Sequence, residues 1–415
     1  MPDVPTRCRS CGAVDLRPVL SLGRTPLANA LRTAEQLEEP EQTYPLEVVF
    51  CPRCALVQIT ETVPPEVLFS EYFYLSSFSD TVVQNAEALA RRLIGSQALG
   101  PESLVLEIAS NDGYLLQHYH HKGIPVIGIE PAANIACVAR EERGIPTLCE
   151  FFGERLAAEL RGSGKLADVI HGNNVLAHAA DLNGVVRGIS LVLKPRGVAV
   201  IEVPYVKDLI DHCEFDTIYH EHLCYFSLTA LWRLFARHGL EIRDVERIPI
   251  HGGSLRIFVT GADGSAELEA PAGAVARLLD EEAAWSGDSE AFYRGFGSMV
   301  ERLREDLLRL LAGLKAQGKR IAAYGASAKG STLLNYFGIG RETLDFVVDR
   351  STVKQGRYTP GTRLPIHAPE RLLEEMPEYV LLLTWNFADE ILAQQEAYRR
   401  RGGRFIIPIP ECRVV

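Results

Sequence analysis

The sequence predicts an α/β protein with a Rossmann-like core, a small N-terminal metal-binding module and a C-terminal Rossmann-like α/β domain. Two Cys-x-x-Cys pairs stand near the start of the chain, and two separate strand, tight loop and helix patterns follow them. Strands that alternate with helices are typical of α/β folds built on a parallel sheet. The 415 residues are enough for two or three domains of ordinary size, and the motifs favour three.

The composition is that of a globular protein and excludes several classes of function. Hydrophobic residues make up 47% and charged residues 23%. The formal net charge of −11 argues against a general nucleic-acid or anionic-membrane binder. There is no apolar signal segment at the start, nine cysteines are too few for a disulfide-stapled scaffold, and no run of about 18 apolar residues occurs. We expect a cytoplasmic monomer that binds no nucleic acid and spans no membrane.

The cysteine pairs predict a structural zinc site. Cys8 and Cys11 form one pair, and Cys51 and Cys54 form the other. Four thiolates fill a tetrahedral zinc site and leave no open position, so the metal would support folding rather than catalysis. Paired buried thiols or redox thiols are the alternatives, although a redox Cys-x-x-Cys needs only one pair beside a βαβ pattern.

A nucleotide-binding core is predicted from strand and loop patterns. The apolar strand Leu104–Ile108 leads into the loop Ala109–Gly113 and a helix-like segment, Tyr114–Leu116. A second strand, Val126–Ile129, ends in Glu130, an acid suited to hold ribose hydroxyls. The loop lacks G-x-G-x-x-G and favours a ligand without phosphates, such as S-adenosylmethionine, in a methyltransferase-type Rossmann domain. The candidate donor-binding residues are Glu107, Ala109, Ser110, Asn111, Asp112, Gly113, Glu130, Pro131, Asn173 and Asn174.

The densest group of reactive side chains is Tyr219-His220-Glu221-His222. A metal site is one interpretation, but histidines two residues apart do not have the i, i+4 spacing of helix-borne ligands. Histidines satisfied by ordinary hydrogen bonds are another. We prefer general acid/base chemistry, because His and Tyr exchange protons and Glu can orient an imidazole. In an extended segment both histidines would share one face, whereas a turn would change this arrangement. Periodicity alone therefore does not show which histidine acts as the base.

Three further groups of candidates each have a structural alternative. His178 follows a predicted strand, where a histidine can face a cofactor or simply cap the chain. Tyr72 and Tyr74 belong to an aromatic run that could be catalytic or could pack in the core. Gly253 and Ser254 belong to a segment that could form a hairpin turn or approach a ligand closely.

A second strand, glycine-rich loop and helix pattern spans Arg320–Thr332, after a helix over Phe296–Leu314 with apolar residues at helical spacing. Small residues, a helix N-terminus, hydroxyls and Lys329 would make a phosphate cradle. The alternative is a structural α/β domain with a solvated lysine. The candidate substrate-binding residues of this half are Gly325, Ser327, Lys329, Asp349, Tyr358, Trp385 and Asn386.

Motifs along the whole chain carry a family resemblance. Both cysteine pairs are followed in order by EIASNDGYLL, NNVLAHAADL, YHEH, HGGS, YGASAKG and TWNF. The chain thereby resembles the three-domain sugar C-methyltransferases, which use S-adenosylmethionine to branch deoxy-sugars carried on thymidine diphosphate (TDP) in antibiotic and related biosynthesis. The resemblance implies a zinc-binding module over residues 1–68, a donor-binding methyltransferase domain over 69–265 and a nucleotide-sugar-binding α/β domain over 266–415.

The resemblance also implies roles for single residues. His222 would abstract the proton, and Ser327 and Lys329 would meet the diphosphate. Ala109 departs from the family pattern, which often has glycine there, and its methyl narrows the loop. The residues that would line the sugar are Tyr219, Glu221, His178 and one of Tyr72 or Tyr74.

The chemistry follows from the acceptor. A carbon beside a ketone, which would be C-3 of a TDP-4-keto-sugar, becomes nucleophilic only after its proton leaves. His222 would supply the base, and Tyr219 or His178 would donate a hydrogen bond to the enolate oxygen. The alternatives are a nicotinamide-dependent nucleotide-sugar oxidoreductase, an O- or N-methyltransferase with the same donor fold, and a zinc-ribbon binding module on an inactive scaffold.

Overall fold

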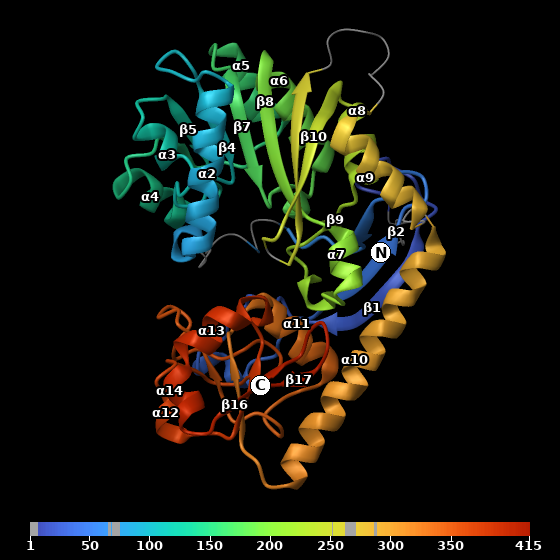
Figure 1. Cartoon of the computed structure of the whole chain (residues 1–415), viewed down its shortest axis with the longest axis vertical. Coiled ribbons are helices and arrows are strands. Elements are labelled where there is room, and N and C mark those ends of the chain that lie inside the picture. Colours follow the sequence, from blue (N-terminus) through green and yellow to red (C-terminus); the bar gives the residue numbers. More distant parts are fainter. Residues whose placement is uncertain (1–6, 65–67, 69–74, 251, 262–270, 286–288) are drawn as a thin grey trace.

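The structure is a computed structural model, and it describes residues 7–64, 68, 75–250, 252–261, 271–285 and 289–415. Three sheets organise these residues, and Figure 1 shows them as an upper lobe, a lower lobe and a smaller sheet beside the junction of the two lobes. Within the described ranges, no helix is long and apolar enough to cross a membrane.

The smaller sheet is antiparallel and contains a strand from the middle of the chain. Its order is β1-β2-β3-β9. In β9, Tyr225 pairs with Val57 and Cys224 with Gln58, so the N-terminal module is completed by a segment that follows the YHEH motif. The strands are β1 (Arg17–Thr25), β2 (Tyr44–Phe50), β3 (Val57–Ile59) and β9 (Cys224–Tyr225), with a 3-10 turn η1 (Glu35–Glu38) between β1 and β2.

The central sheet of the upper lobe has seven strands in the order β10-β11-β8-β7-β4-β5-β6. The five strands from β8 to β6 in this order are parallel, and β11 and β10 add an antiparallel hairpin at one side. The strands are β4 (Val105–Ile108), β5 (Val126–Ile129), β6 (Thr147–Leu148), β7 (Ala167–Asn173), β8 (Leu193–Pro204), β10 (Leu240–Ile248) and β11 (Ser254–Gly261).

The helices of this lobe follow the predicted alternation with one difference. The expected helix-like Tyr114–Leu116 consists of turns, and the helix begins at Gln117, because Asn111 and Gly113 have positive φ and the chain must first leave that turn. The helices are α2 (Asp80–Ser96), α3 (Gln117–His120), α4 (Ala133–Glu141), α5 (Glu154–Gly162), α6 (Leu182–Val192), α7 (Val206–Asp211) and α8 (Leu228–Ala236). The 3-10 turns are η2 (Ser76–Phe78), η3 (Leu176–His178) and η4 (Phe215–Thr217).

The lower lobe is a second α/β unit with the order β14-β13-β12-β15-β16-β17, of which only β17 is antiparallel to its neighbour. The strands are β12 (Ile321–Tyr324), β13 (Val347–Val348), β14 (Ile366–His367), β15 (Tyr379–Leu382), β16 (Arg404–Ile407) and β17 (Arg413–Val414). The helices are α11 (Ala328–Phe337), α12 (Arg371–Glu375), α13 (Ala388–Gln394) and α14 (Glu396–Arg400), with the 3-10 turn η5 (Trp385–Phe387).

Two helices join the lobes. α9 (Gly273–Ala284) packs on β10 and α8, and α10 (Glu290–Ala316) runs along one side of the molecule from the upper to the lower lobe (Figure 1). The predicted helix over Phe296–Leu314 lies inside α10. The ring of Tyr293, at the start of α10, stacks on Phe50 of β2 with centroids 4.6 Å apart. α10 therefore anchors the small sheet as well as linking the lobes.

Candidate active site

The predicted donor crevice lies where the strand order of the central sheet reverses. β4 is followed along the chain by β5 on one side, and β7 is followed by β8 on the other. Ligands of open α/β sheets bind outside the carboxyl ends of the strands at such a switch point. Glu107 is near the end of β4 and Asn173 at the end of β7, and these two strands are paired, so both predicted donor residues lie at this switch point.

The loop 109–113 turns sharply because three of its residues adopt the left-handed conformation. The φ angles are +52° at Ala109, +49° at Asn111 and +77° at Gly113. A Cβ on Gly113 would lie 2.9 Å from Cγ1 of Ile145, so glycine is required there. At Ala109 the methyl is tolerated in a conformation that favours glycine, at a cost of about 1 kcal/mol.

Glu130 holds this loop through both carboxylate oxygens. They accept hydrogen bonds from the backbone N–H of Asn111 at 3.0 Å and of Ala132 at 2.9 Å. The N–H of Ser76 donates to Oδ1 of Asn111 at 2.9 Å and joins the start of the upper lobe to the same loop. Glu130 thus shapes the loop, a role the sequence did not indicate, and Pro131 follows it directly at the entry to α4.

Several buried polar atoms at the crevice have no hydrogen-bond partner among the described residues. They are Oε2 of Glu107, Oγ of Ser110, and Oδ1 of Asp112, Asn173 and Asn174. Burial, and then the charges of Asp112 and Glu130, raise the pKa of Glu107 well above its ordinary value. A crevice rich in acceptors and carboxyl groups suits a cationic ligand with hydroxyl and amino donors, and it disfavours a pyrophosphate. The residues present therefore fit S-adenosylmethionine.

The YHEH segment forms a turn, so the alternation expected of an extended strand does not apply. The N–H of His222 donates to the carbonyl of Tyr219 at 2.9 Å. Their side chains consequently meet: the Tyr219 hydroxyl lies 2.8 Å from Nε2 of His222, and the ring centroids are 4.0 Å apart. Nδ1 of His222 lies 2.7 Å from the carbonyl oxygen of Thr217. Because a carbonyl only accepts, Nδ1 carries the proton of the neutral ring and Nε2 is the basic nitrogen.

His178 joins this pair from the end of β7. It lies in η3, and its ring centroid is 4.8 Å from that of His222, edge to face. Burial lowers the pKa of His178 to about 4, so the ring is neutral near pH 7. The N–H of Leu223 donates to the carbonyl of Ala177 at 2.7 Å, which fixes the two histidine-bearing segments side by side.

The other two side chains of the motif face the N-terminal module. Nε2 of His220 lies 3.1 Å from the carbonyl of Pro45, beside Tyr44. Glu221 accepts a hydrogen bond from Nδ2 of Asn29 at 2.7 Å. Burial raises the pKa of Glu221 to about 7. Tyr72 and Tyr74, the other predicted sugar contacts, lie outside the described residues.

The predicted strand, glycine-rich loop and helix of the C-terminal half are present as β12, the loop after it and α11. Ser327 caps α11, its Oγ accepting from the N–H of Gly330 at 3.1 Å. Gly325 has φ +95°, and a Cβ there would come within 2.6 Å of Thr384. The ammonium of Lys329 is buried with no hydrogen-bond partner among the described residues, 4.6 Å from the ring centroid of Trp385. The positive charge of Lys329 acts on the buried carboxyls of Asp216 and Glu214, and its N–H groups suit an additional anionic ligand.

Four other predicted substrate residues have structural partners. Asp349 accepts from the N–H of Ala326 and of Ser351, both at 2.8 Å, and so closes the loop after β13. The backbone of Tyr358 exchanges hydrogen bonds of 2.8 and 2.9 Å with Arg32 of the N-terminal module. Gly253 and Ser254 belong to the hairpin turn between β10 and β11; the Ser254 hydroxyl donates to Ile250, and a Cβ on Gly253 would meet Asp208 at 2.3 Å. His251, two positions before Gly253 in the sequence, lies outside the described residues.

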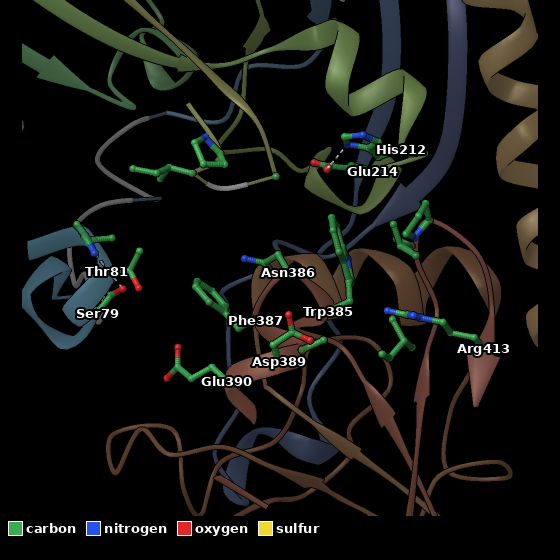
Figure 2. Close-up of a pocket in the computed structure, with 18 residues that line it drawn as sticks. Ser79, Thr81, His212, Glu214, Trp385, Asn386, Phe387, Asp389, Glu390 and Arg413 are labelled. Carbon is green, nitrogen blue, oxygen red and sulfur yellow. Dashed lines mark hydrogen bonds and ion pairs between the residues drawn. The ribbon is translucent and has the colours of Figure 1, made fainter. Parts of the chain in front are cut away.

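A cavity of about 630 Å³ separates the two lobes. Figure 2 shows the predicted residues Trp385 and Asn386 on its lower wall, facing His212 and Glu214 of the upper lobe. Nδ1 of His212 lies 3.4 Å from Oε1 of Glu214, and burial raises the pKa of Glu214 to about 8. Arg413 of β17 adds a positive charge at the far end of this wall.

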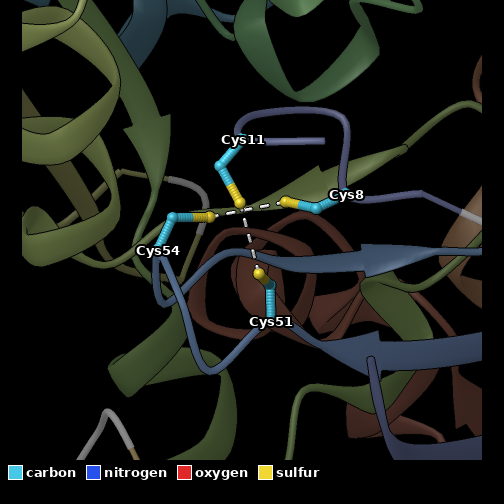
Figure 3. A group of neighbouring side chains, drawn as sticks. All are labelled: Cys8, Cys11, Cys51 and Cys54. Atoms are coloured by element: carbon cyan, nitrogen blue, oxygen red, sulfur yellow. Dashed lines mark hydrogen bonds between the residues drawn. The ribbon is translucent and has the colours of Figure 1, made fainter. Parts of the chain in front are cut away.

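The four predicted metal ligands come together. Their sulfur atoms all lie within 4.8 Å of one another, with Sγ–Sγ distances of 3.4 Å between Cys8 and Cys54 and 3.6 Å between Cys11 and Cys51 (Figure 3). Thiolates at about 2.3 Å from a tetrahedral zinc ion lie about 3.8 Å apart, so the cluster fits zinc. Gly12, at φ +73°, and Ala55, at +63°, close the two equivalent knuckles.

Sequence reasoning missed three residues around the site. Asn29 contacts Glu221, Glu214 lines the cavity, and Asp216 accepts a hydrogen bond from Nε1 of Trp385 at 2.7 Å. Asn29 and Trp385 reach these partners across long separations in the chain, for which local spacing carries no signal. Asp216 and Glu214 stand just before the YHEH motif in the sequence. This closeness was the one sequence signal that these two acids could belong to the site.

Comparisons with known proteins agree with a chain of three successive domains. Successive family models match: one described as a zinc binding domain over residues 8–69, a methyltransferase domain over 83–245 and a C-methyltransferase C-terminal domain over 249–410. C-methyltransferase NovU of Streptomyces niveus is 39% identical over 408 residues, which cover 98% of this chain and 96% of NovU. The chain belongs to the three-domain C-methyltransferase family. It is a methyltransferase dependent on S-adenosylmethionine, and the predicted family resemblance is confirmed.

Solved structures of other methyltransferases are more distant. An S-adenosylmethionine-dependent methyltransferase from Clostridium acetobutylicum has a TM-score of 0.36 and 12% identity, covering 43% of this chain and 92% of that chain. Magnesium protoporphyrin IX methyltransferase ChlM from Synechocystis has a TM-score of 0.34 and 12% identity, covering 43% and 79%. The methyltransferase fold of the core is shown by its sheet order and by the family matches.

Proposed function

We propose that this C-methyltransferase methylates the carbon beside the ketone of a TDP-4-keto-deoxy-sugar, C-3 of the sugar, through an enolate formed by His222. The arrangement of His222 carries the proposal. Its Nδ1–H is directed to the Thr217 carbonyl at 2.7 Å, which leaves Nε2 as a base. After Nε2 takes the C–H proton, the same carbonyl stabilises the imidazolium.

Tyr219 has two successive tasks in this mechanism. In the structure its hydroxyl donates to Nε2 of His222 at 2.8 Å. When the acidic C–H of the sugar approaches Nε2, the phenol must leave this nitrogen and can donate to the ketone oxygen instead. The neutral ring of His178, 4.8 Å from His222, is a second candidate donor. Both donors stabilise negative charge as it develops on the enolate oxygen.

The donor supplies an electrophilic sulfonium methyl group. The crevice between β4 and β7 would hold it, with Glu107, Asp112 and Asn173 meeting its polar groups and the loop 109–113 shaping the crevice. The protein then has to orient the enolate carbon in line with that methyl group. As the new C–C bond forms, the S–CH₃ bond breaks.

The C-terminal domain would hold the TDP carrier. The buried ammonium of Lys329 and the N-terminal end of α11 at Ser327 supply positive charge for the diphosphate. Trp385 and Asn386 line the cavity beside Lys329 and would face the rest of the nucleotide. An overall acidic chain would thus bind a dianion through a few placed groups rather than a basic surface.

The N-terminal module would bind one structural zinc ion through Cys8, Cys11, Cys51 and Cys54. The four sulfur atoms lie within 4.8 Å of one another, and four thiolates would fill a tetrahedral site without an open position.

Deuterium exchange and product structure test the proposed reaction together. TDP-4-keto-deoxy-sugars are incubated in D₂O with methyl-labelled S-adenosylmethionine, and the products are examined by mass spectrometry and NMR. We expect the label on carbon next to the ketone. With S-adenosylhomocysteine in place of the donor, we expect deuterium at the same carbon. A label on oxygen or nitrogen, with no C–H exchange, would overturn the proposal.

A further inference from the structure

The C-terminal domain contacts three of the four residues 215–218, which directly precede the YHEH motif. The ring of Phe215 stacks on Phe337 of α11, with centroids 4.9 Å apart. The Ile218 carbonyl accepts a hydrogen bond from the hydroxyl of Thr332 at 3.2 Å. Between them, Oδ2 of Asp216 accepts from Nε1 of Trp385 at 2.7 Å. A short turn of the methyltransferase domain is thus fixed by three contacts from another domain.

Thr217, the residue enclosed by these contacts, supplies the carbonyl that orients His222. The backbone N–H and the hydroxyl of Thr217 both donate to the carbonyl of Glu214, at 3.1 and 2.7 Å. These bonds close η4 on itself. The direction of the Thr217 carbonyl then depends on where the flanking residues 216 and 218 are held, and both are held by the C-terminal domain.

Fixing the turn through Asp216 requires a carboxylate to be buried away from water, which costs free energy. Its side chain is fully buried, and burial raises its pKa to about 6, although the charge of Lys329 and the hydrogen bond from Trp385 act in the opposite direction. Its second oxygen has no hydrogen-bond partner among the described residues. An apolar pair would hold two domains together without this desolvation cost, so a directional hydrogen bond at this position indicates a need for orientation.

We propose that Asp216 and Trp385 form a positioning pair that aims the Thr217 carbonyl at Nδ1 of His222 and so keeps the base in its active tautomer. This inference rests on the proposed function for the role of His222. The pair does not touch the reacting atoms. It makes the C-terminal domain a support of the catalytic base as well as a candidate nucleotide-binding unit.

Two substitutions of Asp216 test the pair. Asp216→Ala removes the acceptor, and we expect C–H exchange with S-adenosylhomocysteine bound, together with kcat, to fall about 10-fold or more. Affinity for S-adenosylhomocysteine should stay within about 2-fold, because the contacts of Asp216 are with the C-terminal domain and not with the donor loop 109–113. Asp216→Asn keeps an oxygen that can accept from the indole N–H, and it should restore most of the exchange rate.

The tautomer provides a readout independent of turnover. In protein with ¹⁵N-labelled histidine, the His222 signals are identified by their loss in His222→Asn. We expect the protonated nitrogen to be Nδ1 in the native protein and a mixture of Nδ1–H and Nε2–H in Asp216→Ala. If that variant does not fold, Trp385→Phe removes the same hydrogen bond while keeping an aromatic ring, and the same shift is expected.

A matched control separates positioning from general loss of stability. Tyr398→Phe deletes another buried hydrogen bond of the C-terminal domain, from the Tyr398 hydroxyl to the Pro377 carbonyl at 2.6 Å, and should leave exchange and tautomer unchanged. Native exchange and native tautomer in Asp216→Ala would overturn the positioning pair. Absence of exchange in the native protein would instead overturn the proposed function, and the tautomer measurement would still decide the inference.

Discussion

His222 shows at the scale of one residue how contacts on two sides set the chemistry of a side chain. The Thr217 carbonyl accepts a hydrogen bond from the Nδ1–H of His222, and the Tyr219 hydroxyl donates to Nε2. We predict that His222→Ala lowers turnover by about 10²-fold or more, since a positioned general base contributes that much. Binding of S-adenosylhomocysteine, measured by calorimetry, should not change because the donor crevice lies at β4 and β7.

The neighbouring histidine is the natural control for this prediction. His220 belongs to the same motif but faces the Pro45 carbonyl. His220→Gln keeps an N–H donor for that carbonyl and should retain C–H exchange. Equal turnover in His222→Ala and the native protein would remove His222 from the mechanism.

Glu221 should make the stability of the protein depend on pH. Burial raises its pKa to about 7 in the folded state, above the value of about 4.5 that an exposed glutamate has. The stability it contributes is therefore fully present below about pH 4.5 and is lost as pH rises through 7, because the unfolded chain releases the proton first. Glu221→Gln cannot ionise, and we expect it to be more stable than the native protein at pH 8, by up to about 3 kcal/mol.

Urea unfolding at pH 5 and pH 8 checks this expectation. The advantage of Glu221→Gln should shrink markedly at pH 5, and the exposed substitution Glu38→Gln should show no such change. A pH-independent difference would contradict the raised pKa of Glu221.

Candidate site residues could be named from the sequence, whereas their contacts could not. Local spacing singles out the cysteine pairs and the loop that carries Lys329, whereas the choice of His222 over His220 came from the family resemblance. The contact between Tyr219 and His222 depends on a turn, and periodicity assumes either a helix or a strand. Asn29 meets Glu221 across 192 positions of the chain, and no local pattern encodes such a pair.

At the scale of elements, one buried carboxylate joins two helices. Oε1 of Glu282, in α9, accepts from the Tyr205 hydroxyl at 2.9 Å and the N–H of Leu228 at 2.7 Å. Oε2 accepts from the N–H and the hydroxyl of Thr229, at 2.8 and 2.6 Å. Leu228 and Thr229 begin α8, so Glu282 satisfies first-turn donors that have no partner within their own helix.

We predict that Glu282→Ala lowers the free energy of unfolding by about 3 kcal/mol or more, because it leaves buried donors unsatisfied. The midpoint of urea unfolding measures the loss. Glu281→Ala removes the same charge from the adjacent, exposed position of α9 and should change stability by less than about 0.5 kcal/mol. Similar midpoints for the two variants would show that the carboxylate contributes little to the α8–α9 junction.

Helices and strands with a clear apolar pattern in the sequence were predicted best. β5 has the predicted bounds, Val126–Ile129, and α10 contains the predicted helix. The two-residue strand β9 had no detectable signal, because a strand of that length is defined by its partner β3 rather than by its own sequence. The helix expected at Tyr114 was displaced by the turn at the donor loop, where backbone geometry required by the site overrides local propensity.

At the scale of the whole molecule, the turn that carries Tyr219 and His222 is held from two sides. The C-terminal domain holds residues 215–218 before it, and the N-terminal sheet takes up β9 after it. The N–H of Ile59 also donates to the carbonyl of Leu223, the residue that follows His222, at 3.1 Å. The order of domains along the chain was predictable from motifs. This interlocking was not, because it depends on contacts between distant segments.

Removal of the proposed zinc should therefore affect catalysis from a distance. Cys51 and Cys54 directly follow β2 and precede β3, so loss of the metal would loosen the sheet that holds β9 beside His222. We expect chelation, or Cys51→Ser, to reduce folding yield and to lower C–H exchange. Binding of S-adenosylhomocysteine should persist in the protein that remains folded. Added zinc should restore exchange after chelation but not in Cys51→Ser.

A substitution of the exposed Cys149, which lies outside the cluster, is the control: Cys149→Ser should behave as native protein. A metal-free protein with full exchange activity would show that the four thiols support the catalytic turn without zinc.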